Sequence, residues 1–267
     1  MSATASRWDL QGDGGRQLAV WVDGEGPALV LVHGSMCDHT ALEGLAAELR
    51  RDYTTFAVDR RGFGASPDTD DYSAEREFDD VAAVVDAVAE RNGGPVVLFG
   101  HSWGASSAMG GAARSRHIRR LVLYEPSLGL RYPCDLLDRI EAQVAAGDAE
   151  GAILSVLRGL AGLTEEQAEA MRSSPTWPAR LATAPTIVRE ARIEDGWVHR
   201  PGEFDAIAAP TFFLEGSESP PELAEVTRQC AAAIPNARVQ MLEGHGHFAY
   251  RTHPAEVAAI IARFARE

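Results

Sequence analysis

Gly100-His101-Ser102-Trp103-Gly104 is the stretch that decides the fold. Residues 96–99 before it are apolar and residues 105–113 after it are small, which indicates a strand, a sharp turn and a helix. The pattern G-x-S-x-G in this context is a nucleophile elbow with Ser102 at its apex. The turn is strained and crowded, so the residues two positions before and two positions after Ser102 must be small. Gly100 and Gly104 meet this requirement. The helix N-terminus behind Ser102 favours developing negative charge.

Strands and helices alternate on both sides of this turn. Strand-like apolar runs and amphipathic helical periods follow one another along the chain, which predicts a doubly wound, mostly parallel β-sheet of the α/β class. The expected strands are residues 7–10, 17–22, 28–32, 54–58, 96–99, 121–124, 211–214 and 237–242, and the expected flanking helices are 40–50, 73–90, 221–233 and 254–266.

The alternation stops between residues 127 and 209, where only helical patterns occur. The expected helices there are 135–146, 150–160, 165–172 and 179–192. Because the insertion is bounded by two sheet strands, we expect it to cover the end of the sheet at which open α/β folds bind ligands. We therefore predict a core of residues 1–126 and 210–267 and a helical cap, or lid, of residues 127–209.

Composition excludes several classes of partner. The 267-residue chain has a formal net charge of −14, and all 25 basic residues are arginine. Such a field repels polyanions, so we expect no nucleic acid and no anionic membrane as partner. Cys37, Cys134 and Cys230 are odd in number and widely spaced, which favours a reduced, cytoplasmic setting without disulfides or a metal site. The first nine residues contain no apolar stretch, so we expect no signal peptide.

A nucleophilic serine requires a base and an orienting acid. Two histidines, His245 and His247, follow the last predicted strand and compete for the role of base. An oxyanion loop is predicted at His33-Gly34-Ser35, where the backbone amide of Ser35 would act together with that of Trp103. His33 and His101 lie in tight turns beside the sheet, and we interpret both as structural.

Taken together, these motifs resemble the α/β-hydrolase superfamily, in its capped serine hydrolase branch. The resemblance rests on the elbow, the His33-Gly34 loop, the turn at residues 59–66 (DRRGFGAS) and the Gly246-His247 ending, which occur in the family's order. It covers essentially the whole chain and favours His247 over His245 as the base. The residue 59–66 turn is interpreted as structural, although its arginines could also reach the mouth of the pocket.

The acid is where the sequence departs from the family. The commonest family position corresponds here to Ser219, which is not an acid, although Glu218 lies one residue before it. A second arrangement in the family places the acid directly after the strand that follows the elbow helix, which is Glu125 here. A carboxylate buried at that place would need a partner such as an imidazolium or imidazole. We favour Glu125 and keep Glu218 as the alternative.

We expect an apolar cavity for a medium-sized substrate. Its candidate wall residues are Met36, Phe248 and, from the cap, Tyr132, Trp177 and Trp197. Trp103 is a further candidate because it follows the nucleophile. Packing between cap and core is the competing interpretation of each aromatic residue.

The sequence thus predicts a serine hydrolase that needs no cofactor and no metal and acts on a small-molecule ester, lactone or thioester through an acyl-enzyme on Ser102. Two alternatives stay open. A lyase or cyclase could use His247 as a base without acylating Ser102. A non-catalytic protein could bind a small molecule without turnover. Monomer and homodimer are both open.

Overall fold

The computed structural model describes residues 5–12 and 16–267. Residues 1–4, part of the segment from which we expected no signal peptide, lie outside the described residues. Within the described part the strands form one eight-stranded sheet with the order β1-β2-β4-β3-β5-β6-β7-β8. The strands are β1 (Ser6–Gly12), β2 (Arg16–Asp23), β3 (Ala28–Val32), β4 (Thr54–Val58), β5 (Val96–His101), β6 (Ile118–Tyr124), β7 (Thr211–Gly216) and β8 (Ala237–Leu242).

All pairings from β4 to β8 are parallel, and only the pairings of β2 with β1 and with β4 are antiparallel. The predicted doubly wound, mostly parallel sheet is therefore confirmed. The order reverses around β3, because β4 lies on one side of it and β5 on the other. A reversal of this kind leaves a crevice at the carboxyl ends of the strands, where open α/β sheets bind their ligands.

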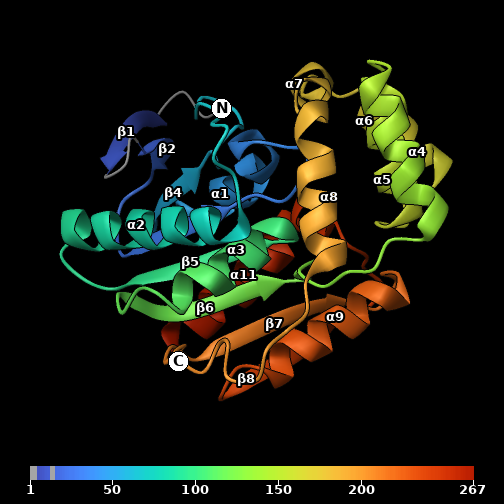
Figure 1. Ribbon diagram of the computed structural model, residues 1–267. Coiled ribbons are helices and arrows are strands. Elements are labelled where there is room, and N and C mark those ends of the chain that lie inside the picture. The colour runs from blue at the N-terminus through green and yellow to red at the C-terminus, as the bar shows by residue number, and fades with distance from the viewer. Residues whose placement is uncertain (1–4, 13–15) are drawn as a thin grey trace.

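Helices cover both faces of the sheet (Figure 1). On one face lie α2 (Ala74–Asn92), α3 (Trp103–Ala112) and α9 (Pro221–Ala232), and on the other lie α1 (Glu43–Leu49), α10 (Ala249–Thr252) and α11 (Pro254–Arg266). The alternation within β3 explains this, since Val30 and Val32 join the first hydrophobic cluster and Leu29 and Leu31 the second. Burial of both faces is what the continuous apolar runs predicted.

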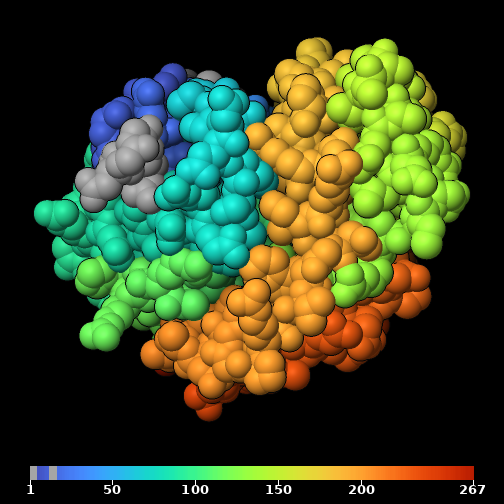
Figure 2. All heavy atoms as spheres, viewed as in Figure 1, coloured from blue at the N-terminus to red at the C-terminus, as the bar shows by residue number. Residues whose placement is uncertain are grey.

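Between β6 and β7 the chain forms helices only. They are α4 (Cys134–Ala145), α5 (Ala149–Gly159), α6 (Glu165–Arg172), α7 (Trp177–Ala182), the short 3₁₀ helix η3 (Ala184–Thr186) and α8 (Ile187–Gly196). Figure 1 shows these helices beyond the arrowheads of β5, β6 and β7. In Figure 2 the amber surface of α7 and α8 lies between the cyan surface of the core and the yellow-green surface of α4 and α5.

One predicted helix of this region is wrong. Residues 179–192 were expected to form a single helix, but the chain forms α7, η3 and α8 instead. The break occurs at Pro185, which has no amide hydrogen to donate and whose ring clashes with the preceding helical turn. The division into core and cap domains at residues 127 and 209 stays a prediction.

Candidate active site

Ser102 lies in the turn between β5 and α3 with φ 55° and ψ −126°. Its amide donates to the carbonyl oxygen of Tyr124 at 2.9 Å, which ties the turn to the neighbouring strand β6. A Cβ atom on Gly104 would collide with the carbonyl oxygen of His33, so the turn can approach the oxyanion loop only with glycine there. The Ser102 side chain lines a cavity beneath the helices of the 127–209 region.

Glu125 follows β6 directly, and sheet register explains its position. His101 pairs with Tyr124 across β5 and β6, so the residues that follow them, Ser102 and Glu125, leave the sheet side by side. Oε2 of Glu125 accepts a hydrogen bond from Nδ1 of His247 at 2.6 Å, and Oε1 accepts from the amide of Gly216 at 2.7 Å. The carboxylate is fully buried, and these two donors compensate its loss of water.

His247 reaches this carboxylate from the loop after β8. Because its Nδ1 donates to Glu125, Nε2 of the neutral ring is left to accept a proton. His247 and Ser102 line the same cavity. The structure therefore brings Ser102, His247 and Glu125 together at the carboxyl ends of β5, β8 and β6.

The two competing residues lie elsewhere. Nε2 of His245 is 3.0 Å from a carboxylate oxygen of Glu256 on α11, away from the cavity. Glu218 is exposed and does not line the cavity, and its amide donates to the carbonyl of His245. The β7–α9 loop thus presents no buried carboxylate toward His247.

Backbone strain concentrates at this site. Among the described residues four that are not glycine have positive φ, and three of them are Met36, Ser102 and Glu125. The fourth, Asn236, lies in a turn before β8. Positive φ is costly for residues with a side chain, and such residues cluster at functional sites where the surrounding structure holds them.

The His33 side chain fixes the predicted oxyanion loop by hydrogen bonds. Nδ1 of its buried ring donates to the carbonyl of Gly34 at 2.8 Å, and Nε2 accepts from the amide of Arg60 at 3.1 Å. Burial and the nearby Arg60 guanidinium lower the pKa of His33 to about 4. The amide of Trp103 belongs to the first residue of α3 and therefore has no acceptor within that helix.

His101 and Tyr124 hold the loop that carries His247. Nε2 of His101 donates to the carbonyl of His247 at 2.8 Å, and the Tyr124 hydroxyl donates to the carbonyl of Gly246. Burial lowers the pKa of His101 well below its ordinary value, and the neighbouring His247 lowers it further. The rings of His33 and His101 thus hold neighbouring loops by hydrogen bonds, as predicted, and His101 also lines the cavity. The role of Tyr124 escaped the sequence analysis because this residue lies at the end of an ordinary strand.

The cavity over Ser102 has apolar walls from the core and from the inserted helices. Met36, Tyr132 and Phe248 line it, as do aliphatic side chains that the sequence analysis did not single out. These are Leu130, Val156, Leu157, Leu160, Ala161, Ile187 and Leu223.

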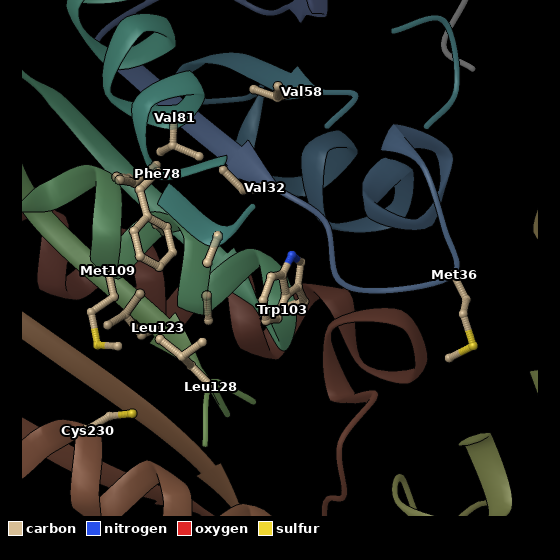
Figure 3. Close-up of a cluster of buried hydrophobic side chains, with 14 of the residues drawn as sticks. Val32, Met36, Val58, Phe78, Val81, Trp103, Met109, Leu123, Leu128 and Cys230 are labelled. Atoms are coloured by element: carbon tan, nitrogen blue, oxygen red, sulfur yellow. The ribbon is translucent and has the colours of Figure 1, made fainter. Parts of the chain in front are cut away.

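None of the three tryptophans considered for the wall lines the cavity. Trp103 is fully buried in the main core cluster, and Figure 3 shows its indole among core side chains while Met36 extends away from them. Trp177 is buried in the same cluster, and Trp197 packs edge-on against Phe78 with ring centroids 6.0 Å apart. Packing between insert and core therefore decides the position of these rings.

A buried group of charges centred on Arg60 lies next to the cavity wall, although Arg60 itself does not line the cavity. Arg60, from the predicted structural turn, is 3% exposed and binds Glu77 of α2 and Glu190 of α8 at 2.8 Å each. Its Nη2 also donates to the carbonyl of Gly34 at 3.1 Å. Arg60 thus connects core, insert and oxyanion loop. An arginine in a tight turn can be recognised from the sequence, but the carboxylates that bind it cannot.

Glu190 and Glu194 project from α8 to the cavity wall. Burial raises the pKa of Glu190, against the attraction of Arg60. Burial also raises the pKa of Glu194 to about 7, against the hydrogen bond from Tyr132. The Tyr132 hydroxyl lies 2.5 Å from Oε2 of Glu194. A cavity predicted to be apolar therefore contains polar groups on one wall.

With this geometry in place, the chain was compared with known proteins. The model of the alpha/beta hydrolase family matches residues 29–260. The chain belongs to the alpha/beta hydrolase family. Its core residues accordingly lie on a scaffold whose members include many hydrolases.

Individual curated relatives match only part of the chain. The chain is 34% identical over 129 residues to the 2-(acetamidomethylene)succinate hydrolase of Mesorhizobium japonicum, covering 46% of this chain and 44% of that protein. It is 36% identical over 121 residues to the pyrrolizixenacetamide deacetylase of Xenorhabdus hominickii, covering 44% of each. The matched segments thus span less than half of either relative. The structure resembles an alpha/beta hydrolase from Sphaerobacter thermophilus with a TM-score of 0.81 and 30% identity, covering 96% of this chain and 99% of the other.

No helix among the described residues is long and apolar enough to cross a membrane. The expected lack of cofactor, metal, nucleic-acid and membrane partners, the cytoplasmic location and the open oligomeric state stay predictions.

Proposed function

We propose that the protein is a serine hydrolase that cleaves an ester, lactone or thioester of a small molecule through an acyl-enzyme on Ser102. The observation that supports this most strongly is the buried hydrogen bond of 2.6 Å between Nδ1 of His247 and Glu125, beside a strained serine that lines the same cavity. A base oriented by an acid next to an apex serine is the arrangement that nucleophilic catalysis requires.

In the proposed first step, Oγ of Ser102 attacks the substrate carbonyl while Nε2 of His247 takes the serine proton. The tetrahedral intermediate carries its negative charge on the former carbonyl oxygen, which would accept hydrogen bonds from the amides of Ser35 and Trp103. Removal of one such donor typically slows catalysis about a hundred- to a thousandfold. The positive end of α3 adds to this stabilisation.

In the proposed second step, the imidazolium of His247 donates its proton to the leaving alcohol or thiol, and the carbon–oxygen or carbon–sulfur bond breaks. Water then attacks the acyl-enzyme with His247 again as base, which releases the acid and restores Ser102. Glu125 keeps Nδ1 of His247 protonated in both steps and stabilises the imidazolium.

The names of the relatives are consistent with carbonyl hydrolysis. One hydrolyses a succinate derivative and one is a deacetylase. We infer that the substrate here is likewise a small carbonyl compound, held by the aliphatic wall of the cavity.

The test is the mass of the intact protein after mixing with a p-nitrophenyl ester and quenching in acid. We expect an adduct with the mass of the acyl group in the wild type, and none in Ser102→Ala. Ser173→Ala is the matched control, because Ser173 is exposed at the end of α6 and does not line the cavity. An adduct that persists in Ser102→Ala, or ester turnover by Ser102→Ala at the wild-type rate, would contradict the proposal.

A further inference from the structure

A buried arginine that forms no ion pair among the described residues lines the cavity of the proposed nucleophile. Arg180, on α7, is 5% exposed and lines the same cavity as Ser102. Among the described residues no carboxylate lies within 4.0 Å of its guanidinium, and its side chain donates no hydrogen bond. A buried charge is normally paired, because removing it from water is costly.

A second arginine faces the same region. Arg251 of α10 and Arg180 both line a smaller cavity that adjoins the first, and Cys37 lies on the wall of both cavities. Nη1 of Arg251 is buried without a hydrogen-bond partner. Burial lowers the pKa of Arg180, and the charge of Arg251 lowers it further. An anion in the smaller cavity would be attracted by the positive charges of both arginines.

The nearby carboxylates are engaged elsewhere. Asp38 lines the smaller cavity, but its Oδ1 accepts from the amide and the hydroxyl of Thr40 at 3.0 and 2.5 Å. In the larger cavity, Glu190 binds Arg60 and Glu194 binds Tyr132. In the described part of the chain, Asp38 is the one carboxylate on the wall of the smaller cavity and forms no ion pair with either arginine, so the two guanidinium groups leave one positive charge in excess there.

We propose that Arg180 and Arg251 form an anion-binding subsite that holds a carboxylate of the substrate. A guanidinium matches a carboxylate through two parallel N–H donors, which gives orientation as well as affinity. The subsite implies a substrate that carries a carboxylate in addition to the carbonyl attacked by Ser102, such as a half-ester or thioester of a dicarboxylic acid or an acylated hydroxy acid. This substrate class rests on the proposed function.

Binding tests the subsite without catalysis. We would titrate the Ser102→Ala protein with dicarboxylates from malonate to adipate by calorimetry. We expect at least one to bind, and Arg180→Gln in the same background to weaken its binding about ten- to a hundredfold, because a charge-assisted hydrogen bond is lost. Arg180→Lys keeps the charge but not the paired donors, so we expect an intermediate loss.

The matched control is Arg139→Gln, which makes the same change at an exposed arginine of α4. It should leave binding unchanged. Circular dichroism of each variant checks folding, and Arg251→Gln provides a second, independent weakening of the subsite. Failure of every dicarboxylate to bind, equal binding by Arg180→Gln, or tighter binding of inorganic phosphate than of any dicarboxylate would overturn the proposal.

Hydrolysis of anionic and neutral esters tests whether the substrate carboxylate binds at Arg180 during the reaction. Arg180→Gln should raise KM for p-nitrophenyl hemiglutarate or for O-acetyl lactate about ten- to a hundredfold more than it raises KM for neutral p-nitrophenyl acetate. Equal effects on anionic and neutral esters would contradict the inference. Dicarboxylate binding in a protein that hydrolyses no ester would instead refute the proposed function and leave the anion subsite standing.

Discussion

At the scale of single residues, the site depends on charges buried in pairs and groups. Arg60 has two carboxylate partners and one carbonyl partner, all of them buried. Glu194 accepts a hydrogen bond from the Tyr132 hydroxyl, and burial raises its pKa to about 7. The sequence predicted Ser102, His247 and Glu125 because each follows a strand, and strand ends can be recognised from apolar runs. It did not predict Arg60, Glu190 or Arg180, because their roles depend on how separate segments meet.

Replacing Arg60 should be strongly destabilising. Arg60→Met leaves Glu77 and Glu190 buried without their cation, and breaking a buried ion pair in this way costs about 3–5 kcal/mol. Urea unfolding measures this loss against the control Arg139→Met, an exposed change that should cost little. We expect the double variant Arg60→Met/Glu190→Gln to recover part of the loss. A double variant no more stable than Arg60→Met would show that the carboxylate is not the cause.

Glu194 should make stability fall as pH rises. Its folded pKa of about 7 lies above the ordinary value of 4.5, so the folded state binds more protons between these values. The favourable contribution is therefore complete below about pH 4.5 and lost above about pH 7, an effect of about 3 kcal/mol. Glu194→Gln mimics the protonated form and should be more stable than the wild type at pH 8 but not at pH 4.5. Glu166→Gln, an exposed change, is the control in urea unfolding. A stability difference independent of pH would refute this assignment.

At the scale of elements, strand ends and tight turns position the proposed catalytic residues. Ser102 directly follows β5, and Glu125 directly follows β6. His247 follows β8 after a short loop. These strands and the elbow could be predicted because their patterns are local. The break between α7 and α8 could not be read from apolar periodicity, although Pro185 was a signal for it. The positions of Trp177 and Trp197 depended on which face of each helix meets the core, and a lone aromatic residue does not reveal that.

The elbow itself should tolerate no added methyl group. Gly104→Ala places a Cβ against the backbone carbonyl of His33, and backbone atoms cannot rotate away as a side chain does. We expect a loss of more than about 3 kcal/mol in stability, or failure to accumulate folded protein. Gly94→Ala is the control, since nothing lies within 4 Å of its added Cβ and its φ is not positive. Normal thermal stability of Gly104→Ala would mean that the turn is more open than described.

At the scale of the whole molecule, the inserted helices and the sheet share one hydrophobic cluster. Val30 and Leu98 of the sheet belong to it together with Ile153 of α5 and Ile187 of α8. The Arg60–Glu190 ion pair joins the same two parts. The overall sheet could be predicted because alternation of strands and helices is a global pattern. The extent of contact between insert and core could not, because it depends on side chains distant in sequence.

We therefore expect insert and core to unfold together. Hydrogen exchange measured by mass spectrometry across a urea series should show peptides from α5 and from β5 losing protection at the same urea concentration. A contiguous cluster makes partial unfolding expose apolar surface on both sides, which is costly. Loss of protection in α5 at clearly lower urea than in β5 would show that the insert is a separate cooperative unit.

The central claim is that Ser102 is a nucleophile activated by His247 and Glu125. The most direct measurement is the rate of labelling by a fluorophosphonate, followed by intact mass, in the wild type and in Ser102→Ala, Glu125→Gln and Glu218→Gln. We expect one label per chain in the wild type, none in Ser102→Ala, labelling slowed by about three to four orders of magnitude in Glu125→Gln, and an unchanged rate in Glu218→Gln. No labelling of the folded wild type, or slowing by Glu218→Gln rather than by Glu125→Gln, would contradict the account.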